Sequence, residues 1–214
     1  MNILEFEPTD PDFLVARLPA YYDMFPHKFG EVVIQELKPI LEGLKQDLVA
    51  NPPAAVFDID ETLILTNTDD DGFTVHPAVH EVYRFLRQEK VPIFVVTARR
   101  KSEASAQYAI NQLSNFYTEL EDLYMVNAQH DDDESASVFK FKSRKRVIQK
   151  GYTIVLNAGD NWSDLGLMVK YGSNKVHREW KGTYPDKTKH YLLHDAEATS
   201  RLSWKVPNKH YEVA

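Results

Sequence analysis

The sequence predicts an α/β protein with a doubly wound parallel sheet and a helical N-terminal extension. Asn51-Pro52-Pro53 cannot lie inside a helix, and it separates a region of helical periodicity from a region with a different pattern. After the prolines, four short apolar runs alternate with helical patterns. The runs are apolar at successive positions, which is typical of strands buried on both faces of a parallel sheet.

Composition and charge narrow the class of protein. The 214 residues suffice for one sizeable domain, and 43% hydrophobic with 27% charged residues excludes wholesale disorder. The absence of cysteine excludes disulfides, zinc–cysteine sites, iron–sulfur clusters and cysteine nucleophiles. The N-terminus has neither a basic region nor a long apolar run, and no segment approaches the roughly 20 apolar residues that span a bilayer. We therefore expect a soluble cytoplasmic protein with no membrane partner.

Residues 1–51 are expected to form a helical segment that packs on a domain of residues 52–214. Apolar residues recur at spacings of three and four over 33–48, which predicts an amphipathic helix with Pro39 at a kink or in an early turn. Short helices and loop are expected before it. Packing is the favoured role, and a substrate or partner surface the alternative, for three aromatic residues there: Tyr21, Tyr22 and Phe25.

The elements after Pro53 follow from the apolar runs and the periodicity. Strands are predicted at 54–57, 92–96, 123–126 and 153–156. Helices are predicted at 78–87, 102–113 and 143–150. Between residues 63 and 75, Asp71-Gly72 lies between apolar stretches, which is a hairpin signal.

Polar residues follow three of the predicted strands. The first run stops at Asp58, the second at Thr97 and the fourth just before Gly159-Asp160. In a doubly wound sheet, ligands bind outside the carboxyl ends of the strands. The sequence therefore predicts that these residues gather in one site.

Asp58 and Asp60 are the first pair in this group. Two carboxylates two residues apart at a strand end could serve as a nucleophile and its acid–base partner, although an acidic turn gives the same pattern. A calcium loop of the EF-hand type needs a third ligand and a glycine soon after. Thr62-Leu63 occupies those places, so calcium is excluded.

Phosphate and metal binding are suggested by the other two strand ends. The hydroxyl of Thr97 and the loop amides of Ala98 and Arg99 could hold a phosphate oxygen, although a threonine that caps the next helix looks the same. Asp160 and Asp164 could hold a divalent cation together with the first aspartate pair, and carboxylate oxygens suit Mg²⁺. The alternative is an N-cap aspartate followed by a surface acid.

Basic residues cluster over 140–146. Most are typical of a solvated helix face, but one lysine among them could be internal and neutralise a buried anion. A nucleic-acid patch is a third interpretation. The net charge of −7 and the acidic run at 131–134 oppose the field that such a patch needs, so nucleic-acid binding is expected to be weak.

Together, these motifs resemble the haloacid dehalogenase-like (HAD) superfamily of aspartate-nucleophile phosphatases. The resemblance lies in the order D-x-D-x-T, a strand ending in T-x-R, a basic K-S-x-K-R and then G-D-x-x-x-D. Within the superfamily, the chain is similar to acid phosphatase subfamily IIIB, which includes class B, class C and plant acid phosphatases and vegetative storage proteins. That similarity rests on 141–146, 151–152, 159–165 and the tail Lys205-Val206-Pro207-Asn208 with Tyr211.

The resemblance implies a HAD-like, Rossmann-like fold. HAD proteins place a small flap after the first motif, and the roughly 30 residues between that motif and the second strand leave no room for a large cap domain. An open site would accept a small phosphorylated substrate that is not fully engulfed. Alternatively, the N-terminal helices or a second subunit of a homo-oligomer would supply a lid.

Carried over by position, the resemblance also implies roles for individual residues. Asp58 would be the nucleophile that takes the phosphoryl group as an aspartyl-phosphate. Asp60 would protonate the leaving alcohol and then activate the water. The substrate would be bound by Thr97, Ala98, Arg99 and Lys142, and the lysine would also neutralise charge on the nucleophile.

The resemblance further implies Mg²⁺, held by Asp58, Asp160 and the main-chain carbonyl of Asp60 and supported by Asp164. Because carboxylate and phosphate are both anionic, a lysine and a divalent cation are needed to offset their repulsion. The expected function is a Mg²⁺-dependent phosphomonoester hydrolase. Two alternatives stay open: a phosphatase-like storage or binding protein with little activity, which the presence of Asp58 disfavours, and a nucleic-acid end-processing phosphatase.

Overall fold

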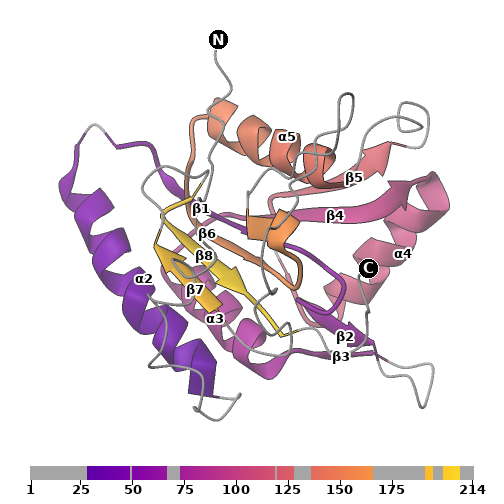
Figure 1. The fold of residues 1–214 in the computed structure, drawn as a ribbon, viewed down its shortest axis with the longest axis horizontal. Coiled ribbons are helices and arrows are strands. Elements are labelled where there is room, and N and C mark those ends of the chain that lie inside the picture. The colour runs from indigo at the N-terminus through magenta and orange to yellow at the C-terminus, as the bar shows by residue number, and fades with distance from the viewer. Residues whose placement is uncertain are drawn as a thin grey trace, which may run out of the picture.

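The structure is a computed structural model that describes residues 28–48, 50–66, 73–118, 120–127, 136–165, 191–194 and 200–207 (Figure 1). Six strands form one sheet in the order β5-β4-β1-β6-β8-β7. They are β1 (Pro53–Phe57), β4 (Ile93–Lys101), β5 (Asp122–Asn127), β6 (Thr153–Gly159), β7 (Tyr191–His194) and β8 (Leu202–Lys205). All neighbours are parallel except β7, which pairs antiparallel with β8. The prediction of a doubly wound, mostly parallel α/β sheet is confirmed.

Helices cover both faces of this sheet (Figure 1). The helices α2 (Phe29–Gln46), α3 (Pro77–Gln88) and α4 (Glu103–Ser114) pack in one apolar core, and α5 (Ala136–Gln149) packs on the opposite face. Alternate residues of β1 face the two sides. Ala55 and Phe57 lie in the core with α2 to α4, whereas Ala54 and Val56 lie against α5. The apolar run is therefore buried on both faces, as its composition predicts.

The N-terminal helix α2 packs on the core of the sheet. One stripe of α2 is buried, and it includes Val33, Leu37 and Leu41. Phe29 stacks on Trp204 of β8, with ring centroids 6.1 Å apart. Pro39 lies on the exposed side of this helix. The division of the chain into segments 1–51 and 52–214 stays a prediction.

The predicted hairpin is present after the first strand. β2 (Ile64–Thr66) pairs antiparallel with β3 (Phe73–Val75), and the turn that contains Asp71-Gly72 lies outside the described residues. Other predicted features also lie outside them: Tyr21, Tyr22, Phe25, the acidic run at 131–134, Asn208 and Tyr211. No helix among the described residues is long and apolar enough to cross a membrane.

Several element bounds differ from the sequence prediction: α2 begins at Phe29 rather than at residue 33, and β4 continues to Lys101 rather than ending at residue 96. α5 begins at Ala136 rather than at residue 143, and β7 and β8 were not predicted. β8 adds a parallel strand beside β6, so the C-terminal tail is part of the sheet.

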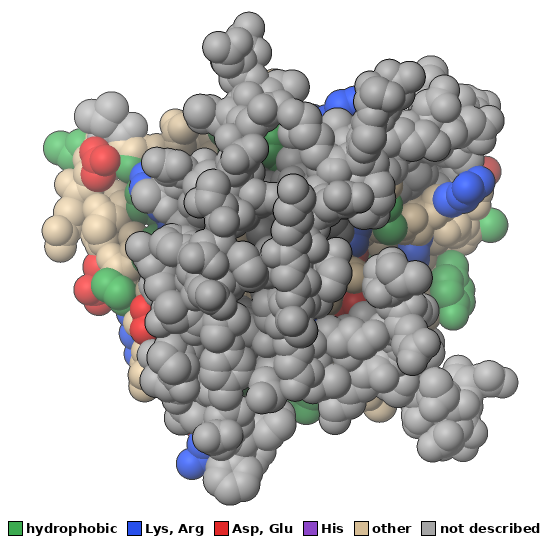
Figure 2. Space-filling model, viewed as in Figure 1, with side chains coloured by type: hydrophobic (Ala, Val, Ile, Leu, Met, Phe, Trp, Pro, Cys, Tyr) green, Lys and Arg blue, Asp and Glu red, His purple; other side chains and the backbone are tan. Residues whose placement is uncertain are grey.

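The described surface carries charges of both signs. On the face drawn in Figure 2, acidic and basic side chains are both visible, some at the rim and some nearer the centre.

Candidate active site

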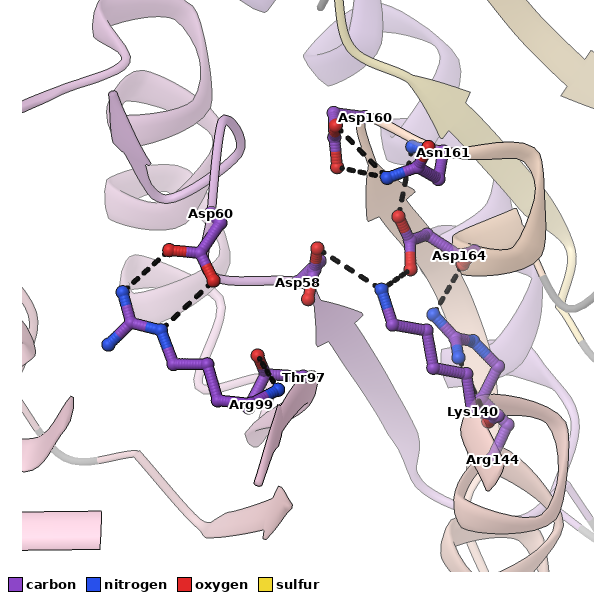
Figure 3. A network of polar contacts seen from close by, with 9 residues as sticks. All are labelled: Asp58, Asp60, Thr97, Arg99, Lys140, Arg144, Asp160, Asn161 and Asp164. Atoms are coloured by element: carbon purple, nitrogen blue, oxygen red, sulfur yellow. Dashed lines mark hydrogen bonds and ion pairs between the residues drawn. The ribbon is translucent and has the colours of Figure 1, made fainter. Parts of the chain in front are cut away.

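Three neighbouring strands bring the predicted site residues together (Figure 3). β4, β1 and β6 are adjacent in the sheet, so their carboxyl ends lie side by side. Asp58 follows β1, Asp160 follows β6, and Thr97 lies within β4 just before a register shift that interrupts the ladder between Thr97 and Arg100. All three predicted strand-end residues are buried. They therefore line one place at the carboxyl edge of the sheet.

A tight turn separates the two aspartates of the first motif. The backbone N–H of Asp58 donates to the carbonyl of Ala158 at 3.0 Å, which fixes Asp58 beside β6. The carbonyl of Ile59 then accepts the N–H groups of Thr62 and Ile64, and Glu61 adopts the left-handed region with φ 54°. The chain therefore reverses at once after the motif.

Asp58, Asp160 and Asp164 form a buried carboxylate cluster. One ligand oxygen from each lies within 4.8 Å of the others. Asp164 comes from the short helix η2 (Trp162–Leu165), where its Oδ2 accepts the backbone N–H of Asn161 at 2.9 Å. A Cβ at Gly159 would lie 2.0 Å from the Cβ of Asp164, so only glycine fits at the end of β6.

A buried lysine from α5 balances this cluster, and it is Lys140 rather than Lys142. The Nζ of Lys140 lies 3.2 Å from Oδ2 of Asp58 and also donates to Oδ1 of Asp164. Lys142 is exposed, so the expectation that it faces Asp58 is corrected. Two residues along a helix turn the side chain by about 200°, which carries Lys142 away from the face that Lys140 shares with Arg144.

Arg144 is a buried residue of α5 that contacts the residues around the cluster. It is not among the site residues predicted from the sequence. Its Nη2 donates to the carbonyl of Asp164, its Nη1 donates to the carbonyl of Lys140 at 2.9 Å, and its Nε donates to Asn157 at 2.9 Å. The spacing of Lys140, Arg144 and the buried Val147 marks one helix face. That spacing was the sequence signal for the internal basic residues.

Burial and mutual repulsion perturb the acids of the cluster. Burial, followed by the carboxylate of Asp164, raises the pKa of Asp58 well above its ordinary value. The same two causes, in the same order, raise the pKa of Asp160 to about 7. Burial acts to lower the pKa of Lys140, but Asp164 and Asp58 outweigh it and the net change is upward. Burial and repulsion thus favour the protonated forms of Asp58 and Asp160 over their charged forms.

Asp60 lies on the other side of Asp58 and pairs with Arg99. The Nε of Arg99 donates to Oδ2 of Asp60 at 2.9 Å, and its Nη2 donates to Oδ1 at 2.6 Å. The backbone N–H of Arg99 also donates to Oγ1 of Thr97 at 3.2 Å. Ala98, between them, is exposed. Figure 3 shows Asp60, Thr97 and Arg99 on the side of Asp58 away from Lys140.

The chain matches known proteins over most of its length. A family model described as HAD superfamily, subfamily IIIB (acid phosphatase), matches residues 68–214, which begins after Asp58 and Asp60. Acid phosphatase 1 of Solanum lycopersicum is 27% identical over 143 residues, which are 56% of this chain and 55% of that protein. The chain thus matches about half the length of this relative.

Solved structures give weaker likenesses. A class C acid phosphatase from Bacillus anthracis with tungstate bound is 14% identical, with a TM-score of 0.48, over 75% of this chain and 85% of that one. A chain of an RNA repair complex is 20% identical, with a TM-score of 0.47, over 57% of this chain and 40% of that one. The family model covers well over half of the sequence, and the chain therefore belongs to the HAD superfamily, subfamily IIIB, the acid phosphatases.

Proposed function

We propose that the protein is a Mg²⁺-dependent phosphomonoesterase in which Asp58 forms an aspartyl-phosphate. The observation that carries the proposal is the setting of Asp58. Its side chain is buried, and its Oδ2 forms an ion pair with Lys140. Its Oδ1 is buried without a hydrogen-bond partner among the described residues. The carboxylates of Asp160 and Asp164 lie on one side and the Asp60–Arg99 pair on the other. Membership of the acid phosphatase subfamily supports the same reaction class.

The residues present fit a divalent cation. Buried carboxylates that repel one another, with one oxygen lacking a partner, are the hard oxygen donors that Mg²⁺ prefers. Asp58, Asp160 and the main-chain carbonyl of Asp60 would hold it. Both oxygens of Asp164 already accept hydrogen bonds, from Lys140 and from Asn161, which suits a supporting role. Bound there, the cation would offset the repulsion between nucleophile and phosphate.

In the proposed reaction, each side chain has a separate role. The carboxylate of Asp58 attacks phosphorus, the bond from phosphorus to the ester oxygen breaks, and Asp60 gives a proton to the departing alkoxide. Asp60 next removes a proton from a water, whose oxygen attacks the phosphorus and releases inorganic phosphate and the free Asp58 carboxylate. Lys140 offsets charge on Asp58 and the phosphoryl group throughout. Thr97 would contact a phosphate oxygen.

Asp58→Asn tests the nucleophile. The change keeps the size of the side chain and removes its nucleophilic oxygen, so turnover of p-nitrophenyl phosphate should fall by several orders of magnitude. The wild type should yield a base-labile phosphoenzyme on acid quench, and the variant should yield none. Near-normal activity of the variant with Mg²⁺ present would contradict a mechanism in which Asp58 is the nucleophile. A wild type without Mg²⁺-dependent activity would instead favour the storage or binding protein.

Asp60→Asn tests the acid–base role separately. General acid–base catalysis contributes about 10²–10⁴-fold, and most of it should be lost on an alkyl phosphate. p-Nitrophenolate leaves without needing a proton, so the loss on p-nitrophenyl phosphate should be much smaller. An equal loss of turnover on both substrates would contradict the acid–base role assigned to Asp60.

A further inference from the structure

Gln112 of α4 is a buried polar side chain at the edge of the site that the mechanism above does not use. Only 7% of it is exposed. Its Oε1 accepts a hydrogen bond from Nη1 of Arg99 at 2.6 Å, and its Nε2 donates to the hydroxyl of Tyr108 at 3.0 Å. Gln112 therefore connects helix α4 to the arginine that holds Asp60.

The contacts of Arg99 define the orientation of its guanidinium. Nε and Nη2 form a two-point contact with the carboxylate of Asp60, and Nη1 is the remaining nitrogen. A planar group that is held on two edges cannot rotate without breaking bonds on both. Gln112 thus fixes the plane of the guanidinium, and that plane fixes the carboxylate of Asp60.

The direction of the Gln112 amide is set by Arg99, because a guanidinium only donates hydrogen bonds. A flipped amide would turn its NH₂ group toward Arg99, and two donors would then face each other. With the carbonyl facing Arg99, the NH₂ group points the other way and donates a hydrogen bond to the Tyr108 hydroxyl. Tyr108 itself is 58% exposed, so this outer contact lies at the surface.

Asp60 needs such support because its own side chain is 40% exposed. An exposed carboxylate samples several rotamers, whereas a general acid must face the leaving group. We propose that Gln112 is a positioning residue that acts through Arg99 to keep Asp60 directed at the leaving group. This inference rests on the acid–base role proposed for Asp60.

Gln112→Leu removes the acceptor at nearly constant size. Turnover of an alkyl phosphate should fall about tenfold or more, within the range that acid–base catalysis supplies, while turnover of p-nitrophenyl phosphate should change much less. Gln112→Glu keeps an oxygen that can accept from Nη1 of Arg99. This variant should therefore restore the wild-type ratio of turnover on the two substrates. Asn111→Leu is the matched control, because Asn111 is the adjacent amide and accepts an exposed hydrogen bond from Gln107 at 2.8 Å. It should leave both rates unchanged.

Tyr108→Phe provides a second variant that keeps the fold even where Gln112→Leu unfolds. Loss of its hydroxyl should also lower the turnover of an alkyl phosphate more than that of p-nitrophenyl phosphate, but by less than Gln112→Leu does. Unchanged rates in both variants, or equal losses on both substrates, would overturn the positioning role. If the wild type hydrolyses neither ester, the proposed function fails instead, and the two failures are thereby distinguished.

Discussion

The ammonium of Lys140 lies 3.2 Å from Oδ2 of Asp58, while Lys142, two residues along the same helix, is exposed. Both lysines belong to α5, so the position of each lysine on the helix decides which of them reaches Asp58. Lys140 shares its face with Arg144 and with the buried Val147. The geometry of α5 therefore determines that the ammonium of Lys140, and not that of Lys142, lies beside the Asp58 carboxylate.

Lys140→Met and Lys142→Met form a matched pair. Loss of Lys140 leaves Asp58 and Asp164 without their buried cation, and breaking a buried ion pair costs about 3–5 kcal/mol. Turnover of p-nitrophenyl phosphate by Lys140→Met should also fall about 10²-fold or more, because a charge-stabilising donor is lost. Lys142→Met should stay near wild type in both activity and urea unfolding. A larger loss of activity in Lys142→Met than in Lys140→Met would contradict the assignment.

The family resemblance assigns the role of neutralising Asp58 to Lys142, and the sequence pattern around it does not reveal that Lys140 faces Asp58 instead. In Phe139-Lys140-Phe141-Lys142, apolar and basic residues alternate, and alternation is a strand signal that hides the helical face. α5 nevertheless begins at Ala136, because Phe139, Lys140 and Val147 are buried on the sheet. Tertiary packing decides the conformation of this segment.

The strand ends could be predicted, whereas contacts between distant segments could not. Asp58 directly follows an apolar run and Asp160 follows another after a few residues, and parallel topology places such strand ends together. Asp60 and Arg99 are 39 residues apart, and their pairing depends on the turn after Asp58 and on the bulge in β4. β7 (YLLH) and β8 (LSWK) contain no run of four apolar residues, which is the signal that predicts the strands at 54–57 and 123–126.

Gly159→Ala should displace Asp164, a member of the buried carboxylate cluster, by adding a Cβ to the backbone at the end of β6. The added Cβ would meet Asp164 at 2.0 Å, so η2 must move, and such overpacking costs about 1–3 kcal/mol. Gly43→Ala is the control, since a Cβ at Gly43 in α2 meets nothing within 4 Å and alanine favours a helix by about 1 kcal/mol. Urea unfolding of both variants measures the difference. A Gly159→Ala protein as stable as wild type would show that Asp164 is not tightly placed.

Leu37→Ala tests whether α2 belongs to the same folding unit as the sheet. Leu37 is fully buried, and its truncation should lower the free energy of unfolding by about 2–5 kcal/mol in a single transition. Leu48 is 99% exposed, and Leu48→Ala should change stability by less than about 0.5 kcal/mol. A separate early transition for α2, followed by unfolding of the rest at the wild-type midpoint, would show that α2 folds independently.

The carboxylate cluster predicts a pH-dependent effect of Mg²⁺ on stability. Burial and then Asp164 raise the pKa of Asp58, and they raise that of Asp160 to about 7. Between about pH 4 and about pH 7, the metal-free folded protein therefore binds more protons than the unfolded chain, and its free energy of unfolding falls as the pH rises. Mg²⁺ displaces those protons, so it should raise the Tm more at about pH 7.5 than at about pH 5.

Thermal melts in chelator and in excess Mg²⁺ at both pH values measure this linkage without reference to activity. Asp160→Asn removes a ligand and a raised-pKa carboxyl together, so the Mg²⁺-dependent rise in Tm should largely disappear. Asp122→Asn is the control, because Asp122 lies on β5 in an exposed ion pair with Lys150 and its pKa is lowered rather than raised. That variant should keep the full response to Mg²⁺. An equal rise in Tm at both pH values would mean that Mg²⁺ does not replace protons on these carboxyls, and the cation would then bind elsewhere.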